Sequence, residues 1–452
     1  MKKLISLMLC ALLCLALLPA TAETVEPTVS GDYEYVVLED GTAEIAKYTG
    51  AADALDIPAE LDGLPVTAIG RRAFSSCDSL TAVTIPEGVT SIGEKAFVYC
   101  TALTGVTIPE GVTAIGNEAF SGCESLAEIA IPGSVTEVGV NPFTSCSALA
   151  SITVPADHPA LEIIDGALFG KADHRLICCP AKLPALTFDI PQGTEIIDGS
   201  AFSWCMMLKT VAIPDSVKEI GVNPFDGCFL LESIEVSPDN PVFEALGGVL
   251  FDKADHRLVC CPPAMSGEIY EIPQGIETIG AYAFSCCNFT GVTIPDSVTA
   301  IEDDAFSVSD LTAIAIPDSV TEIGKSAFTR CDGLTEVTIP AGVTVLSNDI
   351  FAYCEGLTRV AIPEGVTVIG ARAFIDCGNL TEVNIPESVT EIGLAAFNGC
   401  AGLTALSIPA GVEKIERLAF DDCENLTLTV SAGSYAEQYC RENELNFVLA
   451  EG

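Results

Sequence analysis

Cysteine is the residue type with the clearest potential for chemistry in this 452-residue sequence, which has 20 Cys and only 3 His. Twelve of the cysteines occupy one position of a repeated pattern, mostly at steps of 23 residues. They are Cys77, Cys100, Cys123, Cys146, Cys205, Cys228, Cys287, Cys331, Cys354, Cys377, Cys400 and Cys423. Cysteines form disulfides in exported proteins, bind zinc, or act as nucleophiles.

The long and regular spacing favours buried thiols over disulfides or zinc. Equivalent residues on neighbouring coils of a stacked structure have parallel Cα–Cβ vectors about 4.8 Å apart. A disulfide instead needs converging Cβ atoms about 3.8 Å apart. Zinc knuckles separate their cysteines by only about two to four residues. We therefore predict a column of thiols that pack as small hydrophobic side chains.

Three pairs of cysteines are adjacent in sequence: Cys178-Cys179, Cys260-Cys261 and Cys286-Cys287. Because neighbouring residues on a strand face opposite sides, we expect one exposed thiol in each pair. The one enzyme hypothesis is a Cys–His nucleophile made of His174 and Cys178. We favour the alternative that His174 and His256 are polar turn residues copied by duplication. The expectation is a protein without catalysis and without a cofactor.

The cysteine column belongs to a frame that fills most of the chain. One copy runs from Ile92 to Ala114, and the next begins at Ile115. The frame reads I-G-x-x-A-F-x-x-C-x-x-L-T-x-V-x-I-P-x-x-V-T-x. Its Phe recurs at Phe74, Phe97, Phe120, Phe143, Phe202, Phe225, Phe284, Phe306, Phe328, Phe351, Phe374, Phe397 and Phe420. A fixed period of this length is the signature of a solenoid.

Each part of the frame predicts one element. Residues 103–108 are rich in β-branched side chains and predict a strand, which Pro109 ends. Residues 112–115 predict a second short extended piece. One turn of helix with a single inward face is predicted by the spacing of Ala119, Phe120, Cys123 and Leu126. The expected fold is an α+β solenoid of stacked parallel strands with short helical turns, capped at both ends.

The predicted boundaries follow from where the frame starts, stops and widens. Residues 1–22 read as a secretory signal peptide, with Lys2 and Lys3 before an apolar run and Ala20-Thr21-Ala22 at the cleavage site. Residues 23–56 predict an N-terminal hairpin cap, 57–430 the solenoid, and 431–452 a C-terminal cap. Two enlarged repeats predict projecting hairpins near 160–182 and 242–264, and these match each other at an offset of 82 residues.

The net charge and the hydropathy of the chain limit the classes of partner that it could bind. The chain has 20 Lys and Arg against 63 Asp and Glu, a net charge of −43, which argues against nucleic acid. After the N-terminus, no apolar run approaches the roughly 20 residues of a membrane helix. With no sortase-type motif and no apolar C-terminal tail, we expect secretion or loose surface attachment. The candidate partner contacts on the outward strand face and hairpin tips are Glu128, Glu336, Arg359, Glu382, Asn384, His174, Arg175, His256 and Arg257.

The frame L-T-x-V-x-I-P-x-x-V-T-x-I-G-x-x-A-F-x-x-C resembles the BspA-like class of leucine-rich repeat proteins, over about residues 32–449. The resemblance implies a leucine-rich repeat fold and a secreted or cell-surface protein. Some members are adhesins for extracellular-matrix or host-surface proteins. It therefore implies a scaffold for protein or glycan interaction, without catalysis. The alternative is a passive structural or weakly calcium-associated surface protein, suggested by acidic turns such as Glu87 and Glu110.

Overall fold

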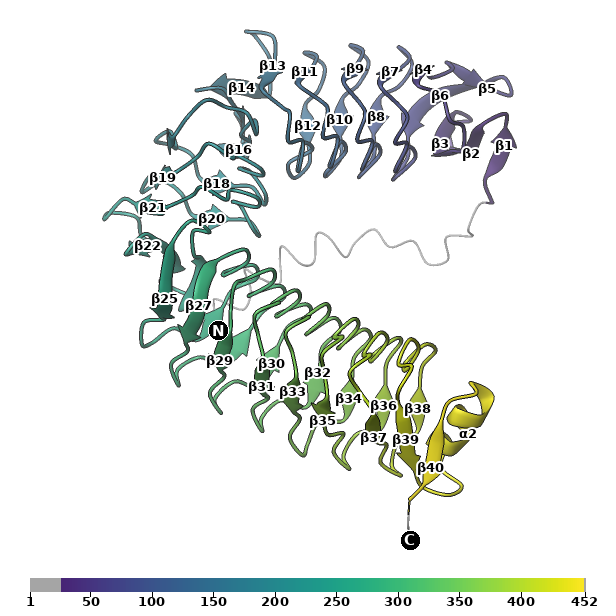
Figure 1. Ribbon diagram of the computed structural model, residues 1–452. Coiled ribbons are helices and arrows are strands. Elements are labelled where there is room, and N and C mark those ends of the chain that lie inside the picture. The colour runs from purple at the N-terminus through teal and green to yellow at the C-terminus, as the bar shows by residue number, and fades with distance from the viewer. Residues whose placement is uncertain (1–25, 451–452) are drawn as a thin grey trace, which may run out of the picture.

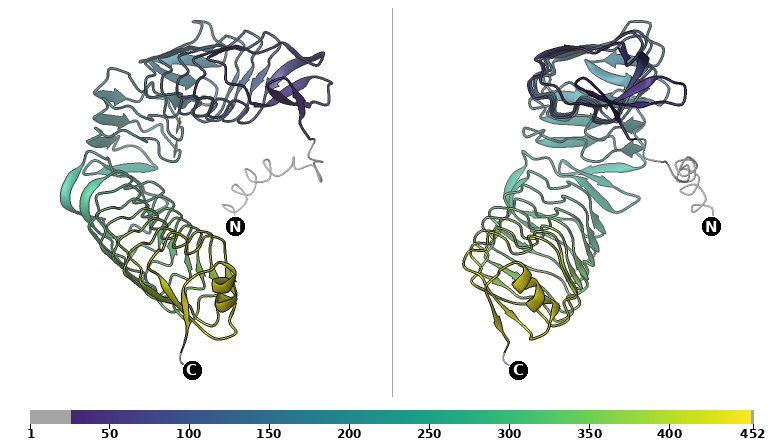
Figure 2. Two further views of the ribbon diagram at one scale, coloured as in Figure 1. Left: turned by 45° about the vertical axis from the view of Figure 1, so that its right-hand side comes forward. Right: turned by 90° about the vertical axis from the view of Figure 1, so that its right-hand side faces the viewer.

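The computed structural model describes residues 26–450, which form a solenoid that curves into an open C (Figure 1). The predicted signal peptide, residues 1–22, lies outside the described residues. Each repeat of the frame forms one coil, and the coils stack along the C, as the two views of Figure 2 show. A coil has three sides: a strand in an outer row, a shorter strand in an inner row, and a side made of turns.

The outer row, whose strands mostly have three or more residues, lies on the convex side of the C (Figure 1). Neighbouring strands are parallel and in register, with Ala82 opposite Gly105. Val83 is buried, whereas Ala82 and Thr84 are exposed, so one face of this row lines the core. The strands are β4 (Ala54–Asp56), β7 (Ala82–Thr84), β9 (Gly105–Thr107), β11 (Glu128–Ala130), β13 (Ser151–Thr153), β17 (Thr187–Asp189), β19 (Thr210–Ile213), β21 (Ser233–Val236), β25 (Ser266–Glu271), β27 (Asn288–Thr293), β29 (Ala313–Ala315), β31 (Glu336–Thr338), β33 (Arg359–Ala361), β35 (Glu382–Val383), β37 (Ala405–Ser407), β39 (Thr427–Val430) and β40 (Phe447–Leu449).

The inner row lies on the concave side of the C and consists mainly of two-residue strands (Figure 1). These strands are also parallel, with Ser91 opposite Ala114. They are β6 (Leu64–Ile69), β8 (Ser91–Ile92), β10 (Ala114–Ile115), β12 (Glu137–Val138), β18 (Ile196–Ile197), β20 (Glu219–Ile220), β26 (Thr278–Ile279), β28 (Ala300–Ile301), β30 (Glu322–Ile323), β32 (Val345–Leu346), β34 (Val368–Ile369), β36 (Glu391–Ile392) and β38 (Lys414–Ile415).

The turn side is where the structure departs from the sequence prediction of helical turns. Lys95 and Tyr99 have left-handed φ angles of 56° and 60°, which no α-helix contains. The N–H groups of Lys95, Phe97 and Tyr99 donate to carbonyls of the next coil at N···O distances of 2.9, 2.7 and 2.8 Å. An α-helix would instead use these donors within its own segment. The fold is therefore a β-solenoid with very little helix rather than an α+β stack.

Buried phenylalanines run along the core as a stack. Phe74 and Phe97 have ring centroids 4.9 Å apart and planes within 10°. The stack runs to Phe143, resumes between Phe202 and Phe225, and resumes again from Phe284 to Phe420. The buried apolar residues accordingly fall into three clusters rather than one.

The enlarged repeats form antiparallel hairpins at the two bends of the C (Figure 1). The last strand of each hairpin pairs in parallel with the inner row, β16 with β18 and β24 with β26. Each hairpin therefore begins a new stretch of the inner row. The hairpin strands are β14 (Leu161–Ile164), β15 (Ala167–Gly170), β16 (Arg175–Cys178), β22 (Phe243–Leu246), β23 (Val249–Asp252) and β24 (Arg257–Cys260).

The two ends of the described chain carry different elements. At the N-terminal end, β1 (Thr28–Ser30), β2 (Tyr33–Val37) and β3 (Ala43–Tyr48) are antiparallel, and β3 pairs in parallel with β6. β5 (Glu60–Leu61) pairs with the start of β6. At the other end, α2 (Tyr435–Glu442) begins after Ser434, whose Oγ accepts the N–H of Glu437 at 3.2 Å. It is the one α-helix among residues 26–450.

Candidate functional site

Ten of the twelve column cysteines are buried and hydrogen-bonded to the coil before them, whereas Cys77 and Cys423, at the two ends of the column, are only partly buried. Cys100 Sγ lies 3.0 Å from the carbonyl oxygen of Phe74, and Cys123 Sγ lies 3.3 Å from that of Phe97. Burial raises the pKa of Cys123 to about 12. The buried column thiols are therefore protonated donors near neutral pH, and a protonated thiol is neither a nucleophile nor a metal ligand. Every cysteine in the described part of the chain is a free thiol.

We predicted that one cysteine of each adjacent pair is exposed, and this prediction is wrong for two of the three pairs. Cys178 and Cys179 are both buried, and so are Cys260 and Cys261. These residues lie at or just after the ends of β16 and β24, where the hairpin packs between coils and covers both faces. Only Cys286, in the third pair, is partly exposed.

The Cys–His hypothesis fails on the placement of its two members. His174 is exposed at the tip between β15 and β16, with a left-handed φ of 52° that suits a turn residue. Cys178 is buried, and desolvation raises its pKa well above the usual value. His256 occupies the same exposed tip of the second hairpin, with φ 48°. Neither histidine stands beside a thiolate.

His158 is a structural residue whose role the sequence analysis did not identify. Its Nδ1 accepts the N–H of Leu161 at 3.0 Å, so the ring proton is on Nε2, 3.1 Å from the carbonyl oxygen of Pro132. Asn240, 82 positions later, uses its amide in the same way: Nδ2 donates to the Pro214 oxygen at 2.8 Å, and Oδ1 accepts two backbone N–H groups. Both side chains anchor the start of a hairpin.

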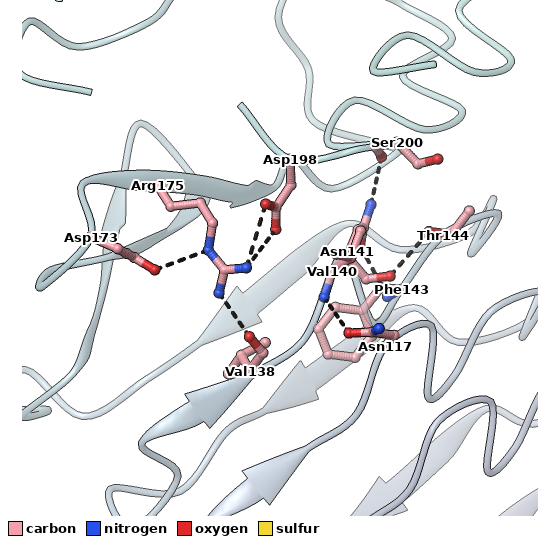
Figure 3. A network of polar contacts seen from close by, with 10 residues as sticks. All are labelled: Asn117, Val138, Val140, Asn141, Phe143, Thr144, Asp173, Arg175, Asp198 and Ser200. Atoms are coloured by element: carbon pink, nitrogen blue, oxygen red, sulfur yellow. Dashed lines mark hydrogen bonds and ion pairs between the residues drawn. The ribbon is translucent and has the colours of Figure 1, made fainter. Parts of the chain in front are cut away.

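Arg175 is the centre of the polar network at the first bend (Figure 3). Its Nη1 lies 3.1 Å from Asp198 Oδ2, and its Nε lies 3.2 Å from Asp173 Oδ2. Burial raises the pKa of Asp198 to about 6, and the neighbouring guanidinium opposes that rise. The Nε contact is an ion pair without hydrogen-bond geometry, because no acceptor aligns with this buried nitrogen.

Arg175 also replaces a missing strand neighbour. Its Nη2 donates to the carbonyl oxygen of Val138, at the end of β12, at 2.7 Å (Figure 3). One coil earlier, the equivalent carbonyl of Ile115 accepts the N–H of Gly139 at 2.8 Å. The side chain of Arg175 therefore satisfies an edge carbonyl that the bend has separated from the next coil. Its guanidinium group is directed into the fold.

The turn side remains connected across the same bend. Asn141 Nδ2 donates to the carbonyl oxygen of Ser200 at 2.6 Å, although the two residues are 59 positions apart (Figure 3). Asn141 Oδ1 also accepts the N–H of Phe143 at 3.0 Å. A side chain thus substitutes here for the backbone bond that joins the turn sides of regular coils.

The second bend uses a different partner for its arginine. Gly280 stands 82 positions after Asp198, so the equivalent carboxylate is absent. Arg257 Nη2 instead lies 2.5 Å from Glu302 Oε2, which belongs to the following coil. Arg257 is partly buried, as Arg175 is. The two hairpin arginines, Arg175 and Arg257, therefore hold bends, while the histidines beside them stay exposed.

The predicted contacts on the outer row are all exposed: Glu128, Glu336, Arg359, Glu382 and Asn384. Arg359 Nε lies 3.3 Å from Glu382 Oε1, an ion pair between β33 and β35. Asn384 Nδ2 donates to the carbonyl oxygen of Ile362 at 2.9 Å. Of these residues, Glu128 borders a hollow.

That hollow lies on the outward face of β7, β9, β11 and β13, and has a volume of about 430 Å³. Small and β-branched side chains line it, including Thr84, Thr107 and Thr153, with Glu128 as its one charged residue. Gly105 contributes to its floor, and a Cβ atom added there would meet nothing within 4 Å. The N-terminal coils therefore present an open, polar concavity.

Exposed apolar side chains on the middle coils were missed by the sequence analysis, which looked for contacts on the strand face. These residues are Leu186, Met206, Met207, Phe229 and Leu230, and the partly buried Trp204 lies beside Phe229. The available signal was their place in the frame. Four of them occupy the two positions after the column cysteine, where polar or small residues stand in most other repeats.

No group of three or more His, Cys, Asp or Glu side chains between residues 26 and 450 could hold a metal ion. Across the same residues, no helix has the length and hydropathy that crossing a bilayer requires.

Comparison with known proteins identifies the family to which the repeat frame belongs. The chain matches the family described as BspA type leucine-rich repeat region over residues 67–184, 178–245, 266–377 and 346–440. No match to the chain was found among the curated proteins.

Solved structures of bacterial leucine-rich repeat proteins are similar over most of the chain. One from Eubacterium ventriosum is 26% identical, covers 88% of this chain and 94% of its own, and has a TM-score of 0.51. A leucine-rich cell surface protein from Faecalibacterium prausnitzii is 27% identical, covers 93% and 98%, and has a TM-score of 0.39. One from Bacteroides ovatus is 25% identical, covers 94% and 100%, and has a TM-score of 0.39.

Proposed function

Because the chain belongs to the BspA-type leucine-rich repeat family, we propose that it is a non-catalytic scaffold that binds protein or glycan partners outside the cell. In general terms it is a leucine-rich repeat protein of the bacterial surface-protein type, and neither the family match nor the similar structures indicate an enzyme family.

The observation that carries the proposal is the hollow on the outward face of β7 to β13. It is open, bordered by hydroxyl groups and by Glu128, and large enough for part of a sugar or an extended peptide. The side chains with catalytic potential have structural roles inside the fold. The column thiols bond to carbonyls, and Arg175 holds a bend. The outside of the stack is therefore the part available for function.

The experiment blocks the hollow without disturbing the core. Gly105→Trp adds a large side chain at a position where a Cβ meets nothing within 4 Å. Gly378→Trp is the matched control, because a Cβ at Gly378 is equally unobstructed but lies on a distant coil. Both proteins and the unmodified chain are screened against extracellular-matrix proteins and surface glycans.

We expect at least one binder at micromolar concentration, weakened about tenfold or more by Gly105→Trp and unchanged by Gly378→Trp. A screen without any binder would contradict the proposal. A melting temperature that rises with calcium, in a chain that binds no protein or glycan, would favour the passive or calcium-associated alternative suggested by exposed turn acids such as Glu87 and Glu110.

A further inference from the structure

The coils between the two bends carry an apolar surface, here named the Trp204 patch and made of Leu186, Trp204, Met206, Met207, Phe229 and Leu230. The members lie on neighbouring coils, because β19 and β21 pair in register and Met206 and Phe229 hold equivalent positions. Met207 is 48% exposed and Leu230 is 47% exposed.

The backbone is arranged to display the indole ring. Gly227 has a left-handed φ of 67°, and a Cβ added to it would lie 3.0 Å from two atoms of the Trp204 ring. The ring therefore lies against this glycine and meets Phe229 edge-on, with centroids 5.9 Å apart and planes at 86°. Aromatic pairs of this geometry attract each other beyond simple area burial, so the two rings hold each other in place.

The patch is a local departure from the frame. The two residues after the column cysteine are Asp78 and Ser79, or Glu355 and Gly356, in regular coils outside the bends. Between the bends they are Met206 and Met207, and Phe229 and Leu230. Folding does not require these residues to be apolar, because they are solvent-exposed and the same coil forms with acids. Contiguous exposed apolar groups of this kind mark interaction sites.

The side-chain types suit a protein contact. Trp is the residue most enriched at binding hot spots, and Met adapts its shape to different partners. Charge is balanced beside the patch, where Lys209 pairs with Glu232 at the start of the adjoining strands. At longer range the chain carries a net charge of −43, which repels a second copy and anionic surfaces and attracts cations.

We propose that the Trp204 patch docks a cationic amphipathic segment of a partner protein, with an apolar face against the patch and Lys or Arg on its flanks. This inference rests on the proposed scaffold function and names a second contact site with its partner chemistry. Apolar contact provides the short-range affinity, and the net negative charge of the chain attracts the cationic segment at longer range.

Trp204 is the only tryptophan of the chain, so its fluorescence emission reports on the patch directly. The probe is a Trp-free helical peptide with leucines on one face and lysines on the other. A scrambled peptide of the same composition and a version with Glu for Lys are its controls. We expect a saturable blue shift with the cationic amphipathic peptide alone, weakening as salt is added.

Variants locate the contact. The double substitution Met207→Ser and Phe229→Ser should weaken binding about tenfold or more and leave circular dichroism unchanged, since both residues are partly exposed. Tyr99→Ser is the matched control, because Tyr99 is exposed and lies against Gly122 as Trp204 lies against Gly227. It should bind the peptide as the unmodified chain does.

Several outcomes would overturn the inference. They are an unchanged emission, an equal response to the scrambled or acidic peptide, self-association abolished by the double variant, and a blue shift caused by phosphatidylcholine vesicles. Failure here leaves the proposed function intact if a matrix or glycan partner still binds and Gly105→Trp still blocks it. If instead no matrix protein or glycan binds but the peptide still does, the hollow on the outer row is rejected as a binding site and the Trp204 patch is not.

Discussion

Phe97 and Phe120 stack face to face in adjacent coils, with ring centroids 5.2 Å apart and planes within 3° of parallel. Both side chains are fully buried. They are 23 residues apart, the length of one coil, so the stack fixes the register between coils. Because each ring contacts the coil before and the coil after, removing one ring affects three coils.

Phe97→Ala should therefore lower the free energy of unfolding by about 3–5 kcal/mol, because it leaves a cavity between two rings that the regular stack cannot close. Urea denaturation measures this loss. Tyr99→Ala is the control: Tyr99 is 59% exposed, and its loss should change stability by about 0.5 kcal/mol or less. Similar losses for both variants would show that the aromatic stack does not hold the coils.

Thiol labelling should follow burial. Cys77, Cys286 and Cys423 are partly exposed and should react with iodoacetamide in the folded protein. Cys354 is buried, its Sγ lies 2.9 Å from the carbonyl oxygen of Phe328, and desolvation raises its pKa. It should react only after unfolding, as mass spectrometry of labelled peptides would report. Labelling of Cys354 in the native state at the rate of Cys286 would contradict the buried ladder.

Asp198 should make the first bend sensitive to pH. Its pKa is about 6 in the folded chain against 3.8 for an ordinary Asp, so folding takes up a proton between these values. The resulting stabilisation is fully present below about pH 4 and is lost as pH rises through about 6. From about pH 4 to 7 the unmodified chain should lose on the order of 2–3 kcal/mol relative to Asp198→Asn.

Denaturation of both proteins across this pH range measures the difference. Asp189→Asn is the control, because Asp189 is exposed on β17 and should keep the pH dependence of the unmodified chain. Parallel pH profiles for Asp198→Asn and the unmodified chain would show that Asp198 does not titrate in this range.

His158 should be replaceable by the residue that the second hairpin uses. His158→Asn supplies one donor and one acceptor, as Asn240 does for Pro214 and Phe243, and should retain most of the stability. His158→Ala leaves the N–H of Leu161 without its partner and should cost about 1–3 kcal/mol. Thermal and urea denaturation compare the two. An equal loss in both variants would mean that the ring packs rather than bonds.

The period of the frame was enough to predict which residues stack, because a residue 23 positions from Phe97 must return to the same place in the next coil. It was not enough to predict the backbone between them. Ala119, Phe120, Cys123 and Leu126 have helical spacing, and all four are buried. Their spacing is satisfied equally by left-handed turns that send hydrogen bonds to the next coil, and periodicity cannot distinguish the two.

The candidate partner contacts also show what the sequence pattern could not predict. Residue type suggested that Arg175 and Arg257 project positive charge from the hairpins. The structure uses both to hold bends, since the sequence carries no information on which carbonyls a bend leaves unpaired. The Trp204 patch was overlooked for a different reason: its members are apolar, and in a sequence an apolar residue beside a buried column resembles core.

The division of the core into three clusters has a mechanical consequence. In a stacked protein each coil is stabilised by its neighbours, so a break in the stack is a break in cooperativity. A chain held at both ends would not yield all at once; its three segments would open one after another as tension grows. Optical-tweezer traces should then show three discrete lengthening steps, and a tether built this way absorbs a sudden pull while part of it stays folded.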